Sequence, residues 1–185
     1  MARVLARLGL SPNAVTLLGL LGAGASAILL RIGQFAAGGA VVLLAAVFDL
    51  FDGALARATG RESRFGALLD STADRVSEAT VLLGLLIHFV YDSSEAGAIL
   101  VYTALAGSIL VSYVRARAGG LRVDCDVGLV TRPERVVALG IGLIIGQWWS
   151  PAVFVVLAAI GALTFITTLQ RVLHVRKELA ASEDR

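Results

Sequence analysis

Long unbroken runs of apolar residues take up most of this sequence, and they constrain its fold more than any other feature. Of the 185 residues, 57% are hydrophobic, against about 45–50% in a typical soluble domain. A helix that crosses a membrane needs about 20 mostly apolar residues, and it must satisfy its own backbone hydrogen bonds in lipid. We therefore expect an all-α integral membrane protein with six transmembrane helices. The expected spans are residues 14–32, 35–57, 65–91, 96–114, 136–149 and 152–173, the fifth being short unless it begins near Arg132.

The two ends of the chain lack such runs. Residues 1–10 contain Arg3 and Arg7 among apolar residues, a pattern typical of a short amphipathic helix at the membrane interface. Residues 174–185 are largely polar and charged, and we expect them to form a cytoplasmic tail. No further domain is expected, so residues 1–185 are assigned to a single membrane domain.

The basic residues predict the orientation of the chain. Fifteen of the 16 lysines and arginines lie at the N-terminus, in or beside the links after the second and fourth spans, or near the C-terminus. Only Arg31 lies on the other side. Because basic residues gather on the cytoplasmic side of a membrane, we expect a multi-pass protein of the cell membrane with both termini in the cytoplasm. The single cysteine, Cys125, excludes an internal disulfide bond.

Four acidic residues lie inside apolar segments, where a charge is costly. Asp49 and Asp52 are in the second expected span, and Asp70 and Asp74 are in the third. Spacings of three and four residues place each pair on one helix face, and the basic turn between the spans lets the pairs meet near one membrane surface. Four carboxylates at close range repel one another, so either their pKa values rise or cations lie between them. Carboxylate oxygens favour hard divalent ions such as Mg²⁺, Mn²⁺ or Ca²⁺. We expect two ions, Mg²⁺ with Mn²⁺ as the alternative, and phosphoryl chemistry between them.

Small and basic residues follow these acids. Gly53 and Ala56 remove bulk from one helix face, so that a ligand can approach the backbone, and Gly66 gives similar clearance on the next helix. Arg57, on the same face as Gly53, could bind a diphosphate. Two other interpretations stay open: structural ion pairs with nearby arginines, or the path of a small ion or proton transporter. A transporter would not need these neighbours, and a purely structural helix bundle would not need the acids.

Together these residues resemble the signature of the CDP-alcohol phosphotransferase family, D-x2-D-G-x2-A-R-x8-G-x3-D-x3-D. The early motif Ser11-Pro12-Asn13-x-x-Thr16 is also similar to that of family members. The resemblance implies an enzyme that transfers a phosphatidyl-type group from a CDP-linked lipid to the hydroxyl of a small alcohol and releases CMP. Metal-dependent release of CMP would separate this enzyme from the alternatives above. The matching positions are Asp49, Asp52, Gly53, Ala56, Arg57, Gly66, Asp70 and Asp74.

The resemblance also implies a role for each matched residue. The four aspartates would bind the two metal ions, and Asp74 would act in addition as the general base toward the alcohol hydroxyl. The family pattern further implies a homodimer in the lipid bilayer, with an active site facing the cytoplasm and no nucleic-acid partner. The residues expected to bind the CDP-lipid are Asn13, Thr16, Gly53, Ala56, Arg57, Ser63 and Gly66.

Three arginines at expected cytoplasmic helix ends indicate the second substrate. Positive-inside topology alone would place Arg115, Arg135 and Arg171 there, but in a closed bundle they would converge and bind a dianionic phosphate. The acceptor would then be a phosphorylated small alcohol. The stretches RFGALLDSTADR, SYVRARA and RPER most resemble family members that use inositol 1-phosphate, although the bacterial ones commonly have lysine at the position of Arg115. We therefore expect inositol 1-phosphate, with glycerol 3-phosphate as the alternative.

Overall fold

The computed structural model describes residues 12–59 and 63–183, and these residues form six helices and no strand. The all-α prediction is therefore confirmed for this part of the chain, and each helix coincides with one expected span. The expected interfacial helix over residues 1–10 lies outside the described residues. The helices are α2 (Pro12–Arg31), α3 (Phe35–Thr59), α4 (Arg64–Tyr91), α5 (Glu95–Gly120), α6 (Arg132–Gly146) and α7 (Pro151–Glu183).

Two boundaries differ from those expected. Helix α6 begins at Arg132, because Pro133 suits the first turn of a helix and the Glu134 carboxylate accepts a hydrogen bond from the Thr131 backbone N–H. This early start gives the fifth span its length. Helix α7 continues to Glu183, so most of the expected tail is helical, since neither glycine nor proline interrupts residues 174–183.

Two of the described helices are long and apolar enough to cross a membrane, Glu95–Gly120 and Pro151–Ser182. Shorter apolar stretches cover Thr16–Arg31 and Phe35–Phe48. Large apolar side chains are exposed along the outer surface, among them Leu21, Leu83, Ile99, Ile145 and Leu169. Such a surface is unsuited to water, and together with the helix lengths it indicates a membrane protein.

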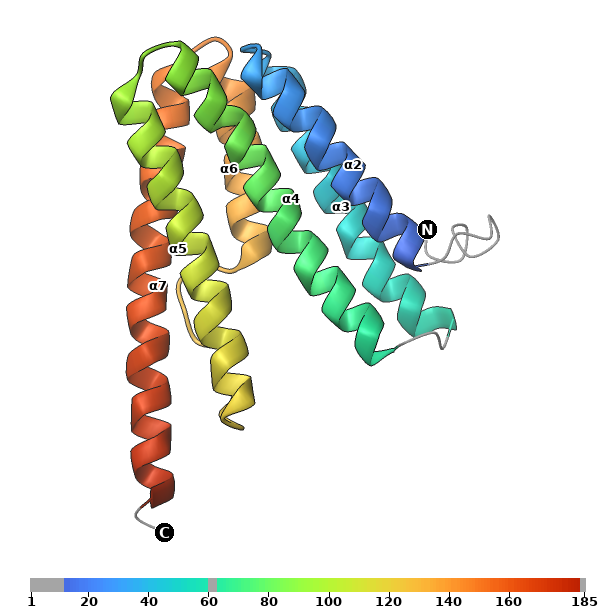
Figure 1. Ribbon diagram of the computed structural model, residues 1–185, viewed down its shortest axis with the longest axis vertical. Coiled ribbons are helices and arrows are strands. Elements are labelled where there is room, and N and C mark those ends of the chain that lie inside the picture. The colour runs from blue at the N-terminus through green and yellow to red at the C-terminus, as the bar shows by residue number, and fades with distance from the viewer. Residues whose placement is uncertain (1–11, 60–62, 184–185) are drawn as a thin grey trace.

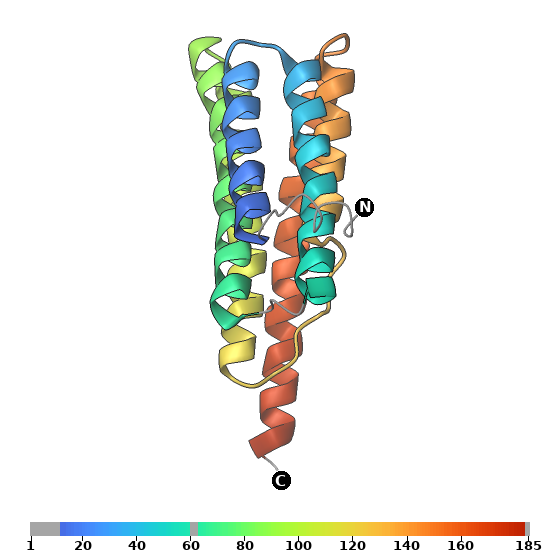
Figure 2. The same ribbon diagram turned by 90° about the vertical axis from the view of Figure 1, so that its right-hand side faces the viewer.

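The helices form a closed ring in which each packs against two neighbours. Following the contacts around the ring gives the order α2, α4, α5, α7, α6, α3 and back to α2. Helices that follow one another along the chain run in opposite directions. The start of α2 and the end of α7 therefore lie toward the same end of the bundle (Figures 1 and 2). We call this end, which contains residues 63–66 and 121–132, the site end. The opposite end contains the short links 32–34, 92–94 and 147–150, and we call it the turn end.

Close helix contacts fix the ring toward the turn end. A Cβ atom added to Gly84 of α4 would lie 2.5 Å from the Ala27 carbonyl oxygen of α2. One added to Gly39 of α3 would lie 2.7 Å from the Gly140 carbonyl oxygen of α6. Only glycine allows these backbones to approach so closely. Fully buried leucines fill the interior beside them, namely Leu30, Leu82, Leu85, Leu143 and Leu157.

Candidate active site

The expected metal-binding aspartates lie on two helices, α3 and α4, in the parts of each that are nearest the site end. Asp49 and Asp52 fall in the last part of α3, and their side chains lie outside the described residues, as do those of Asn13, Gly53, Ala56 and Arg57. Asp70 and Asp74 lie in the first part of α4, where both are half-buried. These carboxylates are four residues apart and therefore lie on one face of α4.

The start of α4 brings together two of the residues expected to bind CDP. Ser63 is the N-cap of the helix, and its hydroxyl accepts a hydrogen bond of 2.9 Å from the Gly66 backbone N–H. A Cβ atom at Gly66 would lie 2.9 Å from the same hydroxyl oxygen. The local structure thus gives both residues a capping role, beside any contact that they make with a nucleotide. Thr16 lies half-buried near the start of α2.

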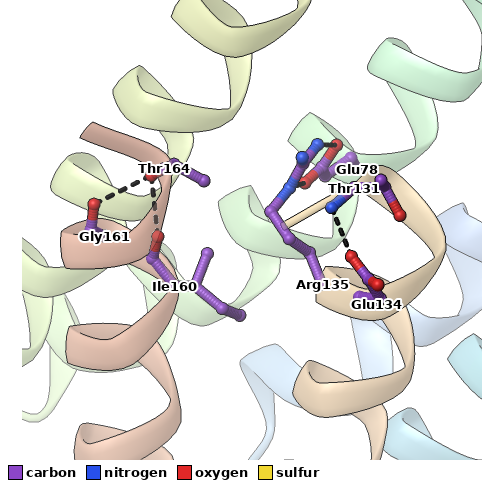
Figure 3. Close-up of polar contacts among 7 residues, drawn as sticks. All are labelled: Glu78, Thr131, Glu134, Arg135, Ile160, Gly161 and Thr164. Atoms are coloured by element: carbon purple, nitrogen blue, oxygen red, sulfur yellow. Dashed lines mark hydrogen bonds and ion pairs between the residues drawn. The ribbon is translucent and has the colours of Figure 1, made fainter. Parts of the chain in front are cut away.

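Two ion pairs join α4 to α6. The Asp74 carboxylate lies 2.9 Å from Nη1 of Arg132. One turn further along α4, both carboxylate oxygens of Glu78 accept hydrogen bonds from Arg135, each of 3.0 Å (Figure 3). Because α4 and α6 are not neighbours in the ring, these side chains bridge its interior.

The structural ion pair that the sequence left open as an alternative is therefore present at Asp74. It does not close the site, because about 20% of the Asp74 side chain and 23% of the Arg132 side chain remain exposed. A partly exposed carboxylate held by an arginine can still meet a substrate from the site end. Glu78 and Arg135 are more deeply placed, with side chains 10% and 2% exposed.

A cavity lies inside the ring next to the two ion pairs. Glu78, Arg132 and Arg135 form its polar wall. The rest of its lining is small or apolar and comes from α2, α3, α4, α6 and α7. Charged residues of the site end and residues of the apolar core, such as Leu82 and Leu139, thus line the same cavity. These other lining residues include Gly19, Ala23, Ala45, Ala46, Ser77 and Val81.

The three arginines expected to bind an acceptor phosphate lie toward the site end, on α5, α6 and α7. Arg171 bonds to the carbonyl of Val111, one helical turn before Arg115 on α5. Arg135 is bound by Glu78, as described above. Arg115 is 60% exposed and forms an ion pair of 2.5 Å with Asp126. The structure thus brings the three together, while their binding of phosphate stays a prediction.

Arg171 is held in a different way. It is 4% exposed, and it donates hydrogen bonds of 2.8 Å to the backbone carbonyls of Val127 and Val111. Within the described residues its hydrogen-bond partners are therefore neutral. The bonds tie α7 to α5 and to the segment of residues 121–131.

This segment packs against α7 beside Arg171. The Leu129 backbone N–H donates to the Thr167 hydroxyl at 3.2 Å. Gly128 has a φ of +139°, and a Cβ atom there would lie 2.4 Å from the Thr167 methyl carbon. Only glycine fits both the backbone conformation and the space. The segment is therefore fixed on α7 and holds Asp126 in reach of Arg115.

Sequence reasoning missed three partners of the expected residues: Glu78, Arg132 as the partner of Asp74, and Asp126. For Glu78 a signal was present, because it follows Asp74 by four residues and continues the helical face of Asp70 and Asp74. The other two had no such signal, since Arg132 lies on another helix than Asp74 and Asp126 lies in a loop.

The donor atoms at the site end suit a hard divalent cation. Asp70 and Asp74 offer carboxylate oxygens only, and α3 brings Asp49 and Asp52 to the same end of the bundle. Hard cations prefer such ligands. Among the side chains that the structure describes, no group of three or more potential metal ligands occurs, as expected when two of the four aspartate side chains lie outside that part.

Comparisons with known proteins show the family of this chain. Residues 9–175 match the family model described as CDP-alcohol phosphatidyltransferase. The chain is 36% identical over 176 residues to the phosphatidylinositol phosphate synthase of Mycobacterium tuberculosis, covering 92% of this chain and 81% of that protein. It is 34% identical over 177 residues to the archaetidylinositol phosphate synthase of Methanothermobacter thermautotrophicus, covering 94% and 87%.

Solved structures show the same likeness. The crystal structure of the M. tuberculosis synthase with CDP-DAG bound matches with a TM-score of 0.87 and 36% identity, covering 94% of this chain and 90% of that one. A crystal structure of the same synthase with manganese and citrate also matches with a TM-score of 0.87 and 36% identity, covering 94% and 86%.

Proposed function

The chain belongs to the CDP-alcohol phosphatidyltransferase family, and from this premise we propose that it transfers a phosphatidyl-type group from a CDP-linked lipid to inositol 1-phosphate, releasing CMP. The observation that supports a phosphorylated acceptor is the position of Arg115, Arg135 and Arg171 toward the site end, where Arg171 bonds to the Val111 carbonyl one turn before Arg115. Guanidinium groups bind phosphate oxygens through strong charge-assisted hydrogen bonds, and an uncharged alcohol would not need them. The lipid donor is CDP-diacylglycerol or its archaeal equivalent, because CDP-DAG is bound by the M. tuberculosis relative.

Divalent metal ions fit the site, and the manganese complex of the relative supports their use. We propose two ions, Mg²⁺ in the cell, held by Asp49, Asp52, Asp70 and Asp74. When bound, such ions neutralise a diphosphate and stabilise the charge that develops on the leaving group. The CDP moiety would lie along the facing surfaces of α2, α3 and α4. The residues proposed to contact it are Asn13, Thr16, Gly53, Ala56, Arg57, Ser63 and Gly66.

Asp74 is the proposed general base. The acceptor hydroxyl oxygen would attack the lipid-linked phosphorus, the bond from this phosphorus to the CMP oxygen would break, and the hydroxyl proton would pass to the Asp74 carboxylate. Arg132, at 2.9 Å from that carboxylate, holds it in a fixed position. The three arginines would meanwhile hold the acceptor by its phosphate, which leaves its hydroxyl free to approach α4.

We propose that all six helices cross the cell membrane and that the site end faces the cytoplasm. The distribution of charge supports this orientation, because Arg115, Arg132, Arg135 and Arg171 lie toward the site end and Arg31 lies at the turn end. The interfacial helix over residues 1–10 and a homodimer stay predictions from the sequence.

Glycerol 3-phosphate is the second candidate acceptor, because it presents the same dianionic phosphate to the same arginines. Inositol 1-phosphate is preferred because two relatives are named as synthases of phosphatidylinositol phosphate and archaetidylinositol phosphate. Two arms of one assay separate the candidates.

The test is an assay of CMP release by the purified full-length protein in detergent with CDP-diacylglycerol and Mg²⁺. Inositol 1-phosphate, glycerol 3-phosphate and unphosphorylated inositol are supplied in separate reactions. We expect release with inositol 1-phosphate alone, its loss with EDTA, and its return when Mg²⁺ or Mn²⁺ is added. The variant Asp74→Asn serves as the inactive control. Release of CMP with glycerol 3-phosphate alone would make glycerol 3-phosphate the acceptor in place of inositol 1-phosphate. If folded, metal-loaded protein releases no CMP with any acceptor, the alternative of a small ion or proton transporter is favoured.

A further inference from the structure

Among the ion pairs of the described residues, that of Glu78 and Arg135 is the most deeply buried. The Arg135 side chain is 2% exposed and that of Glu78 is 10% exposed. Within the described part of the chain, the hydrogen bonds of this guanidinium go to Glu78 alone, from Nε to one carboxylate oxygen and from Nη2 to the other. Figure 3 shows the two groups facing each other edge to edge. This bidentate geometry fixes the plane and the direction of the guanidinium.

The pairing determines which part of Arg135 is left for a ligand. A guanidinium has five N–H donors, and Glu78 takes two of them along the edge between Nε and Nη2. The remaining donors belong to Nη1 and to the second N–H of Nη2, which form the adjacent edge. That edge also presents two parallel N–H groups, the arrangement that matches two oxygens of a phosphate.

From this geometry we infer that Glu78 is a positioning residue, which orients Arg135 so that its free edge binds the acceptor phosphate. The inference rests on the proposed function, in which Arg135 contacts that phosphate. Glu78 itself does not touch the substrate. It acts through Arg135.

The surroundings explain why a carboxylate is needed at this position. Arg171 adds a positive charge nearby, and its hydrogen bonds within the described residues go to backbone carbonyls. An arginine buried beside it without an anion would be repelled and poorly solvated. Glu78 removes this cost for Arg135, and it does so from α4, on the far side of the ring interior. The acceptor site is thus tied to the helix that contains Asp70 and Asp74.

This connection has a consequence for the reaction. The carboxylate of Glu78 follows that of Asp74 by one helical turn, so the proposed base and the support of the phosphate-binding arginine lie on one rigid element. The distance between the acceptor phosphate and the proposed base Asp74 is then set by α4 and by Arg135, which Glu78 holds. A mispositioned Arg135 would weaken binding of the acceptor and leave binding of the CDP-lipid unchanged.

The test is a set of steady-state measurements on the full-length enzyme with inositol 1-phosphate and CDP-diacylglycerol varied in turn. For Glu78→Gln we expect the KM for inositol 1-phosphate to rise by about tenfold or more, while the KM for CDP-diacylglycerol and kcat change by less than about threefold. Glu78→Asp, which keeps the charge, should recover part of the loss. Glu95→Gln, an exposed acid at the turn end, is the matched control and should behave as wild type.

A double variant shows whether Glu78 acts through Arg135. If it does, Glu78→Gln combined with Arg135→Ala will be no worse than Arg135→Ala alone. Additive losses would overturn the inference. So would a Glu78→Gln enzyme in which both KM values and kcat change together, because that result indicates a purely structural pair.

Folding and the proposed function are tested separately. If Glu78→Gln does not fold, the less disruptive Glu78→Asp decides: an unchanged KM for inositol 1-phosphate in that variant would overturn the inference. If the wild-type enzyme uses inositol 1-phosphate and the Glu78 variants have the same KM for it, only the positioning role of Glu78 is refuted. A wild-type enzyme that uses no phosphorylated acceptor refutes the proposed function, and the positioning role with it.

Discussion

The two ends of this helix bundle are held by different interactions. At the turn end, glycines such as Gly84 and Gly39 bring helix backbones into direct contact, and buried leucines fill the space between them. At the site end, ion pairs reach across the ring interior and a cavity lies beside them. Apolar contacts of the first kind stabilise a fold outright, whereas buried ion pairs roughly offset their own desolvation. We infer that the turn end supplies stability and that the site end is retained for chemistry.

The largest effect is expected at the site end. Asp74→Asn removes the proposed base and should lower CMP release by about 10²–10⁴-fold. Because Asp74 is partly exposed, the thermal unfolding midpoint in detergent should change little. If the variant instead unfolds at a clearly lower temperature and keeps its activity, the Arg132–Asp74 pair stabilises the fold. The proposed difference between the two ends would then be wrong.

At the turn end the pattern should be reversed. Gly84→Ala places a Cβ atom 2.5 Å from the Ala27 carbonyl oxygen and should destabilise the protein by about 1–3 kcal/mol. The molecules that remain folded should keep their turnover. Gly24→Ala is the control on α2, because nothing lies within 4 Å of its Cβ position, and it should be neutral or stabilising by up to about 1 kcal/mol. Equal midpoints for the two variants would argue against close packing of α2 and α4.

A smaller effect is expected where a site-end segment is fixed to α7. Thr167→Val removes the hydroxyl that accepts from the Leu129 N–H and should cost about 1 kcal/mol. Hydrogen exchange of residues 121–131 would report the loss most directly. Faster exchange confined to this segment is the expected result, and unchanged exchange would mean that the Gly128 packing and the Arg171–Val127 hydrogen bond are enough to hold it.

The smallest effect is expected at the surface pair of Arg115 and Asp126. Both side chains are well exposed, so Asp126→Asn should change the stability by less than about 1 kcal/mol. If a phosphate competes with Asp126 for Arg115, the KM for inositol 1-phosphate should fall, by at most about fivefold. A higher KM in this variant would instead show that Asp126 helps to hold the acceptor.

Much of this architecture could be predicted from the sequence because it depends on local pattern. The apolar runs located all six helices, and the spacing of Asp70 and Asp74 placed them on one face of α4. The alternation of helix direction was enough to bring Arg115, Arg135 and Arg171 to one end. Each of these inferences needs only the period of a helix and the number of crossings.

The pairs across the ring could not be predicted in the same way. The contact of Glu78 with Arg135 depends on how far α4 and α6 are rotated about their own axes, and packing of the whole ring sets those rotations. The same is true of Arg171, whose partners are backbone carbonyls with no sequence signal. The start of α6 at Arg132 was left open, because only the capping contact of Glu134 decides it.

The position of Arg171 also bears on how the protein is made. Its side chain comes from the last helix and bonds to carbonyls of residues 60 and 44 positions earlier in the chain. The ribosome synthesises these partners first. The loop and α5 are therefore present in the nascent chain before the Arg171 guanidinium that joins them. The proposed acceptor site is therefore completed only after α7 has been synthesised, and a chain that lacks α7 cannot contain it.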